Sequence, residues 1–339
     1  MPAQKGGKTM LQITAALKQL LSRVMLLAAG VVAAAVVAMR IWLMPSIRDW
    51  ETGLFSPNYL VIILMLLCVV ALVVVGRLCG PDRRDITGRP ALSLGIALLV
   101  AGLVLVGYEV VQATNNIPAL LGMMSLLSVV EPGSVTLLPT ILQVVQNAIG
   151  IAGGGALILL ALRLFSEGNI RRGIAQWSAL LPVVWMWVRL INYEMSYSSM
   201  VRLQDSFFGF VMLLMEMWFL FKLARYVSGV GQVSMGSLLA CSLSTAVFAL
   251  SAPIVRLSMW LMGDYAAYAS SLSTVVDFAI GALVAVVAVA LVLTPEPVQE
   301  SKPSTVDAEA AAEFASSEAY IVADLVTSVS DDEEPSTAE

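Results

Sequence analysis

The 339-residue chain contains no histidine at all, which excludes the chemistries that depend on imidazole. These include His-Glu-x-x-His zinc proteases, rhomboid-type Ser/His dyads, histidine-ligated haem and histidine proton relays. Cysteine is nearly as scarce, because Cys68, Cys79 and Cys241 form no C-x-x-C pair and lie in or beside apolar segments. Neither a disulfide framework nor a thiol-based metal or redox site is expected, and packing between helices is the expected role of these thiols.

Charged residues are also few. Lys, Arg, Asp and Glu make up 13% of the chain, whereas apolar residues make up 59%. A soluble globular chain carries about 25% charged residues and about 45–50% apolar ones. The composition therefore predicts an all-α integral membrane protein that contacts the lipid bilayer.

Eight stretches are long and apolar enough to cross a hydrocarbon core of about 30 Å as helices. They are residues 20–44, 58–78, 91–111, 137–163, 173–192, 207–226, 236–261 and 271–293. We therefore predict three parts of the chain. These are an N-terminal segment (1–19), a polytopic transmembrane domain (20–293) and an acidic, largely disordered tail (294–339).

Basic residues alternate between the segments that connect these stretches. The leading segment holds Lys5, Lys8 and Lys18, and the second connection holds Arg77, Arg83, Arg84 and Arg89. The fourth connection and its edge hold Arg163, Arg171 and Arg172, and the sixth and its edge hold Lys222 and Arg225. The segments between them hold only Arg48 and Arg202. By the positive-inside rule this alternation predicts eight spans with both termini in the cytoplasm. Short basic connections and the absence of Asn-x-Ser/Thr sequons favour a bacterial plasma membrane.

Two apolar runs have a second interpretation. Residues 117–130 are too few to span the bilayer upright, and a ninth span there would break the charge alternation. We expect an external helix at this position, either interfacial or re-entrant, that ends at Glu131-Pro132-Gly133. The first run resembles a signal-peptide core, but it continues to Met44, which favours an uncleaved first span.

The tail is set apart by its charge. Residues 296–339 carry a net charge of −11, whereas the rest of the chain carries +6. This sign disfavours anionic lipid and nucleic acid as partners of the tail. Phe314, Ile321, Leu325 and Val329 recur at helical spacing, as in a segment that folds on a partner protein. A solvated tail without a specific role is the alternative.

Ionisable residues inside the predicted spans form the candidate site. They are Arg40, Glu109, Arg189, Glu216, Arg256 and Asp277, which the predicted orientation places from mid-membrane to the outer leaflet. One hypothesis is a polar cavity open to the outside, joined by Gln143, Gln146 and Asn147 from one helix face. Its arginines would bind a carboxylate or phosphate, and Glu216 or Asp277 would bind a proton or a cation.

The alternative is a structural role for the same charges, as ion pairs that hold helices in register. Arg40, Glu109 and Arg189 lie close enough to predicted span ends to reach the headgroups. The aromatic residues of "WMWVRLINYE" and its surroundings would then form an interfacial belt of Trp185, Trp187, Tyr193 and Tyr197.

Enzyme signatures are missing from the sequence. The stretch "GIAGGGA" (150–156) lacks the Gly-Lys-Ser/Thr ending of a phosphate loop, and close helix packing is its expected role. No Gly-x-Ser-x-Gly elbow or intramembrane aspartyl protease motif occurs. We therefore expect no catalysis and no cofactor. The favoured role is a non-catalytic membrane component, such as a sensor, scaffold or complex subunit that contacts a protein through its tail or helix faces. The alternative is a carrier for a small polar or anionic solute.

Overall fold

The computed structural model describes residues 4–47, 59–79, 89–126, 137–167, 175–195, 203–228, 235–261 and 271–294. In these ranges 98% of the residues are helical and no strand occurs, which confirms the predicted all-α class. The helices are α1 (Gln4–Ile47), α2 (Tyr59–Cys79), α3 (Arg89–Leu126), α4 (Leu138–Glu167), α5 (Ala175–Ser178), α6 (Leu181–Met195), α7 (Leu203–Ser228), α8 (Met235–Leu261) and α9 (Ser271–Leu293).

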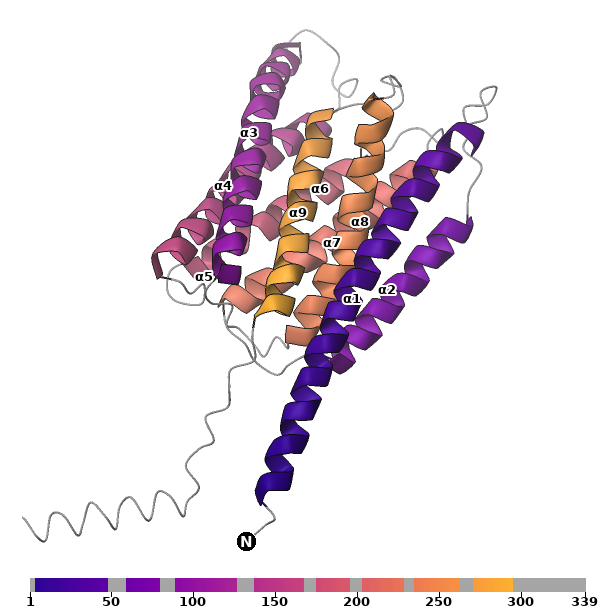
Figure 1. Ribbon diagram of the computed structural model, residues 1–339. Coiled ribbons are helices and arrows are strands. Elements are labelled where there is room, and N and C mark those ends of the chain that lie inside the picture. The colour runs from indigo at the N-terminus through magenta and orange to yellow at the C-terminus, as the bar shows by residue number, and fades with distance from the viewer. Residues whose placement is uncertain are drawn as a thin grey trace, which may run out of the picture. The chain divides into compact units, whose positions relative to one another are not determined.

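Helix α8 is the centre of the packing among these helices. It contacts α9, α7, α1 and α2, while α3 packs along both α4 and α9, and α4 packs on α6 (Figure 1). In the most apolar part of α8, 83% of the residues are buried, against 22% in α1. Helices α8 and α9 therefore form the most buried part of the packing, and α3 and α4 form a closely packed pair beside α9 and α6.

Five helices contain a stretch that is long and apolar enough to cross a membrane. These stretches are Gln19–Trp42, Pro90–Ser125, Leu138–Ser166, Met235–Ser258 and Leu272–Leu293. Helix α2 adds a shorter apolar stretch, Met65–Val74. Large apolar side chains such as Leu27, Val31 and Leu67 are exposed on the outside of the helices. The protein is thus a membrane protein whose apolar outer faces contact the bilayer.

The external helix predicted over residues 117–130 differs from the structure. Helix α3 continues without interruption from Arg89 to Leu126, so residues 117–126 are its last turns, and 127–130 lie outside the described residues. Pro118 lies inside this helix. Neighbouring groups make such a proline tolerable in membrane helices, and here Thr140 of α4 donates a hydrogen bond to the Met123 sulfur at 3.4 Å. Helix α3 therefore continues past Pro118, and its turns beyond the proline pack on α4.

The predicted span over residues 173–192 also differs, because it consists of two helices. The short helix α5 ends at Ser178, and a turn in which the Leu180 N–H donates to the Trp177 carbonyl leads into α6. Pro182 is the second residue of α6, where its missing N–H removes no intrahelical bond. The turn and the proline together account for the interruption.

The glycine-rich stretch of α4 shows the expected close packing. Helix α4 is continuous through residues 150–156. A Cβ added to Gly102 of α3 would lie 2.7 Å from the carbonyl oxygen of Gly154. The two backbones approach each other at small residues, as helices in membranes commonly do.

Candidate functional site

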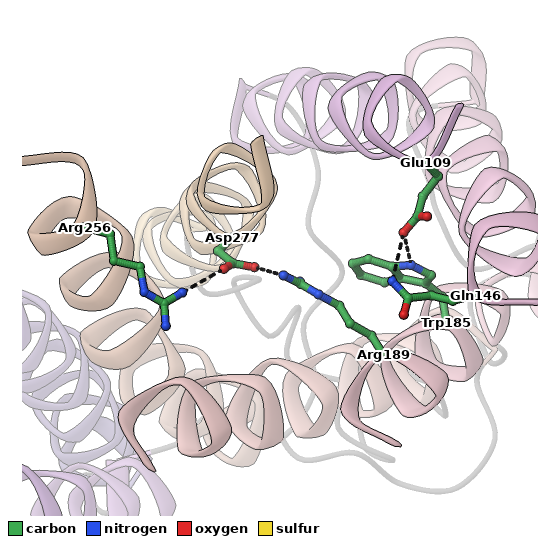
Figure 2. Close-up of polar contacts among 6 residues, drawn as sticks. All are labelled: Glu109, Gln146, Trp185, Arg189, Arg256 and Asp277. Carbon is green, nitrogen blue, oxygen red and sulfur yellow. Dashed lines mark hydrogen bonds and ion pairs between the residues drawn. The ribbon is translucent and has the colours of Figure 1, made fainter. Parts of the chain in front are cut away.

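Three helices meet at an ion-paired triad made of Arg189 on α6, Asp277 on α9 and Arg256 on α8. Asp277 lies between the two guanidinium groups (Figure 2). Its Oδ1 is 2.5 Å from Nη2 of Arg189, and its Oδ2 is 3.5 Å from Nη1 of Arg256. The carboxylate is 1% exposed and the two arginines are 11% and 16% exposed. The triad therefore places two positive charges on one negative charge inside the protein.

Glu216 of α7 is the fourth member of this buried group, which we call the charge cluster: Arg189, Glu216, Arg256 and Asp277. The Glu216 side chain is fully buried. Its charge interacts electrostatically with Asp277, Arg189 and Arg256. Among the described residues, neither of its carboxylate oxygens has a hydrogen-bond partner. A buried polar group normally has one, so Glu216 is exceptional.

A second buried carboxylate, Glu109 of α3, has the opposite surroundings. The Trp185 indole N–H donates to its Oε1 at 2.6 Å, and the Gln146 amide N–H donates to the same oxygen at 3.5 Å. With its amide nitrogen turned toward Glu109, Asn147 donates to Oε2 at 2.9 Å. Figure 2 shows the Trp185 and Gln146 bonds, which join α3, α4 and α6. Glu109 is therefore surrounded by neutral donors.

The neutral network continues around Glu109. The Asn192 amide donates to Gln146 Oε1 at 2.7 Å and to the Leu142 carbonyl at 3.2 Å. Gly150 leaves the space that this arrangement needs, because a Cβ there would lie 2.5 Å from Glu109 Cγ and 2.8 Å from Trp185 Cδ1. Helices α4 and α6 thus hold Glu109 by shape as well as by hydrogen bonds.

Trp185 links the two polar regions. Its ring lies 5.3 Å from the guanidinium carbon of Arg189, a distance at which a cation–π interaction forms. Trp185 and Arg189 are one helical turn apart on α6, so the same helix face contacts Glu109 and Asp277. Tyr108 of α3 also interacts electrostatically with Arg189 and Asp277.

Arg40 of α1 lies over the ring of Phe208, with 4.3 Å between its guanidinium carbon and the ring centroid. The next residue, Gly209, adjoins the charge cluster, because a Cβ there would lie 2.9 Å from Nη2 of Arg256. It would also lie 2.6 Å from the Tyr193 hydroxyl. Arg40 of α1 is therefore buried against α7, the helix that supplies Glu216.

The structure thus brings most of the predicted residues together, in two groups. Arg189, Glu216, Arg256 and Asp277 form the charge cluster, while Gln146 and Asn147 bind Glu109. Gln143 contributes only its backbone carbonyl, which accepts from Asn147 at 3.1 Å, and its side chain is exposed. The expectation that the three polar residues of α4 line one site fails for Gln143, because that position faces outward.

Two parts of the structural alternative change, the placement of Arg40 and Glu109 at the headgroups and the interfacial belt. Glu109 is 0% and Arg40 6% exposed, so these side chains lie between helices rather than extend along the outside. Trp185, predicted in an interfacial belt, is fully buried because its N–H binds Glu109. Trp187 is 59% exposed and faces outward as expected, and Glu194 is exposed at the end of α6.

Trp185, Asn192 and Gly150 were not among the residues predicted for the site. A signal for the first two exists, because residues 185, 189 and 192 recur at helical spacing and share one face of α6. No sequence signal distinguishes Gly150 from the other glycines of α4.

Among the described residues, no three His, Cys, Asp or Glu side chains gather as ligands for a metal ion. Comparison of the chain with protein-family models, with curated protein sequences and with solved structures gives no significant match. The charges and hydrogen bonds of the site are therefore the basis on which its function is proposed.

Proposed function

We propose that the protein is a carrier for a small anionic solute, which the two arginines of the charge cluster, Arg189 and Arg256, bind. The observation that carries the proposal is the fully buried Glu216, without a hydrogen-bond partner in the described part of the chain, beside an Arg–Asp–Arg triad. Ionisable groups inside membrane proteins are costly and commonly mark solute or ion pathways.

The chemistry of the cluster supports an anion as the solute. Nη1 of Arg189 is buried and has no hydrogen-bond partner among the described residues, so it offers an N–H donor next to the triad. A guanidinium group binds carboxylates and phosphates through two parallel N–H donors. Asp277 uses Nη2 of Arg189, so a solute oxygen would accept a hydrogen bond from Nη1, and the guanidinium would bridge Asp277 and the solute.

The carrier would span the membrane eight times, with both termini in the cytoplasm of a bacterial cell. The five apolar helices supply five of these spans. Helix α2, the α5–α6 pair and α7 would supply the remaining three. Helix α7 carries Glu216, Lys222 and Arg225, and these charges lower its mean hydropathy. The alternation of basic connections supports the orientation.

A second candidate is a non-catalytic membrane component with a structural charge cluster. Asp277 already contacts both arginines, and buried ion pairs can serve to fix how helices pack. In that case the acidic tail (294–339) or a lipid-facing helix surface would bind a partner protein, and the cluster would bind nothing.

Uptake by the purified protein in liposomes separates the two candidates. The probes are radiolabelled lactate, succinate and inorganic phosphate, added one at a time. We expect Arg189→Gln to lose the uptake that wild type shows, because it removes the unpartnered donor. The matched control is Arg225→Gln on α7, whose guanidinium lies over Phe221 away from the triad and whose loss leaves uptake intact. Folded wild-type protein that takes up none of the probes contradicts the carrier and favours the membrane component.

A further inference from the structure

Two buried carboxylates of the described structure, Glu109 and Glu216, have no ion-pair contact, and their surroundings are opposite. Glu109 accepts hydrogen bonds from Trp185, Gln146 and Asn147, so both of its oxygens have donors. Glu216 is equally buried and accepts none among the described residues. When two carboxylates of one site have such different environments, one stays ionised while the other binds and releases a proton. Donors on both oxygens stabilise an ionised carboxylate, whereas a carboxyl group without donors is stable when it holds its own proton.

Charged and titratable groups reach Glu216 from several helices. Arg189 comes from α6, Arg256 from α8 and Asp277 from α9, while α5 has no titratable residue. Tyr193 of α6 lies near Gly209 of α7. Further away, Tyr108 of α3 interacts electrostatically with Arg189 and Asp277. Arg40 of α1 lies over the ring of Phe208, and the next residue, Gly209, adjoins Arg256. On α7 itself, the Lys222 ammonium group donates a hydrogen bond to the Ser237 hydroxyl of α8.

The charges of the site balance only when Glu216 is ionised. Its charged groups are three arginines and three carboxylates, namely Arg40, Arg189, Arg256, Glu109, Glu216 and Asp277. With a proton on Glu216 the site carries one surplus positive charge beside Arg189 and Arg256. A buried surplus charge is unfavourable, and a monovalent anion would neutralise it.

We propose that Glu216 is a proton-binding site and that its proton creates the positive charge which one monovalent anion neutralises. This inference rests on the proposed carrier function. The reaction is a proton transfer without oxidation or reduction. An O–H bond of a hydronium ion breaks as the O–H bond of the Glu216 carboxyl forms, which leaves a water molecule. When the anion leaves, the carboxyl O–H bond breaks and the proton returns to water as hydronium. The carrier therefore moves proton and anion in the same direction.

A proton fits this position better than a metal cation. Arg189 and Arg256 both act on Glu216, and two guanidinium groups repel a second cation in a medium of low dielectric constant. A cation also needs several oxygen ligands, and no acidic cluster of that size occurs in the described helices. A proton needs only one carboxylate oxygen.

Infrared difference spectroscopy of the protein in liposomes tests the proton site without any solute. On a change from acidic to alkaline buffer, wild type is expected to lose the carbonyl band of a buried carboxylic acid. Glu216→Gln should lack that change, and the matched variant Glu109→Gln should keep it. Glu216→Asp retains a carboxyl group and should shift the band, which provides a test should Glu216→Gln fail to fold. A wild type without the band, or a band unchanged in both Glu216 variants, would overturn the assignment.

Coupling is tested by adding lactate to the purified protein in unbuffered detergent solution that contains a pH-sensitive dye. Wild type should take up a proton with each bound lactate, so the solution becomes more alkaline, whereas Glu216→Gln should bind lactate without that change. Alkalinisation by Glu216→Gln equal to that by wild type overturns the inference but leaves the carrier function. A wild type with the infrared band that takes up none of lactate, succinate and inorganic phosphate overturns both the coupling and the carrier function, and retains only the proton site.

Discussion

Oδ1 of Asp277 on α9 lies 2.5 Å from Nη2 of Arg189 on α6, in a contact that leaves the carboxylate 1% exposed. These two residues join helices that lie far apart in the sequence. Arg256 of α8 contacts the other oxygen of the same carboxylate. The position of three helices at the site therefore depends on one aspartate.

Asp277→Asn should destabilise the protein strongly, because it leaves two arginines buried without their counter-ion. Removal of one partner from a buried ion pair costs about 3–5 kcal/mol. Thermal unfolding in mild detergent measures the effect. The double variant Asp277→Asn/Arg189→Gln should regain part of the loss, since it also removes one uncompensated charge. A single variant as stable as wild type would contradict the ion pair.

Trp185→Phe should destabilise the protein by about 1.5–3 kcal/mol, the usual contribution of a hydrogen bond to a charged group. The change removes the indole N–H that binds Glu109 at 2.6 Å. Trp187→Phe is the matched control, because Trp187 is 59% exposed on the outer face of the same helix. The control should stay within about 0.5 kcal/mol of wild type. Equal melting temperatures for the two variants would argue against the Trp185–Glu109 bond.

Gly150→Ala should destabilise the protein by about 1–3 kcal/mol, as expected for an added methyl group in a packed interior. The new Cβ would lie 2.5 Å from Glu109 Cγ. Gly155→Ala on the same helix is the control, since a Cβ there meets no atom within 4 Å. Removal of a glycine from a helix should raise stability at that position by about 0.5–1 kcal/mol. The opposite signs of the two changes in melting temperature check the packing of α4.

The proposed membrane topology predicts on which side of the membrane an introduced cysteine reacts. A cysteine in the bare connection, Ser134→Cys, should react with a membrane-impermeant maleimide in intact cells. A cysteine in the basic connection, Asp85→Cys, should react only after the cells are opened, because the proposed topology places that connection in the cytoplasm. Background reaction is measured on the wild-type protein, with its own cysteines. Labelling of Asp85→Cys in intact cells would reverse the proposed topology.

The all-helical class and most of the site residues could be predicted from the sequence, because apolar length and ionisable residues in apolar segments are local signals. The continuation of α3 through Pro118 could not, since it depends on packing against Thr140 of α4. The assignment of Trp185 to an interfacial belt was wrong for a similar reason. Its partner, Glu109, lies 76 positions away in the sequence, and no local pattern reveals that contact.

Which charges pair with each other was also beyond the sequence. Six ionisable residues in six different spans allow many pairings, and helical spacing within one span does not choose among them. The structure selects the Arg189–Asp277 and Arg256–Asp277 contacts and leaves Glu216 outside them. These contacts distinguish Glu216 from Asp277, and the hydrogen bonds from Trp185 and Gln146 distinguish Glu109 from Glu216.

The most direct test of proton coupling through Glu216 is lactate uptake into liposomes with and without an inward proton gradient, measured for wild type and Glu216→Gln side by side. If Glu216 binds the proton that moves with the anion, the gradient accelerates uptake by wild type. It has no effect on Glu216→Gln, which still exchanges lactate across the membrane. Equal acceleration of both proteins, or no uptake by folded wild type, would contradict this coupling.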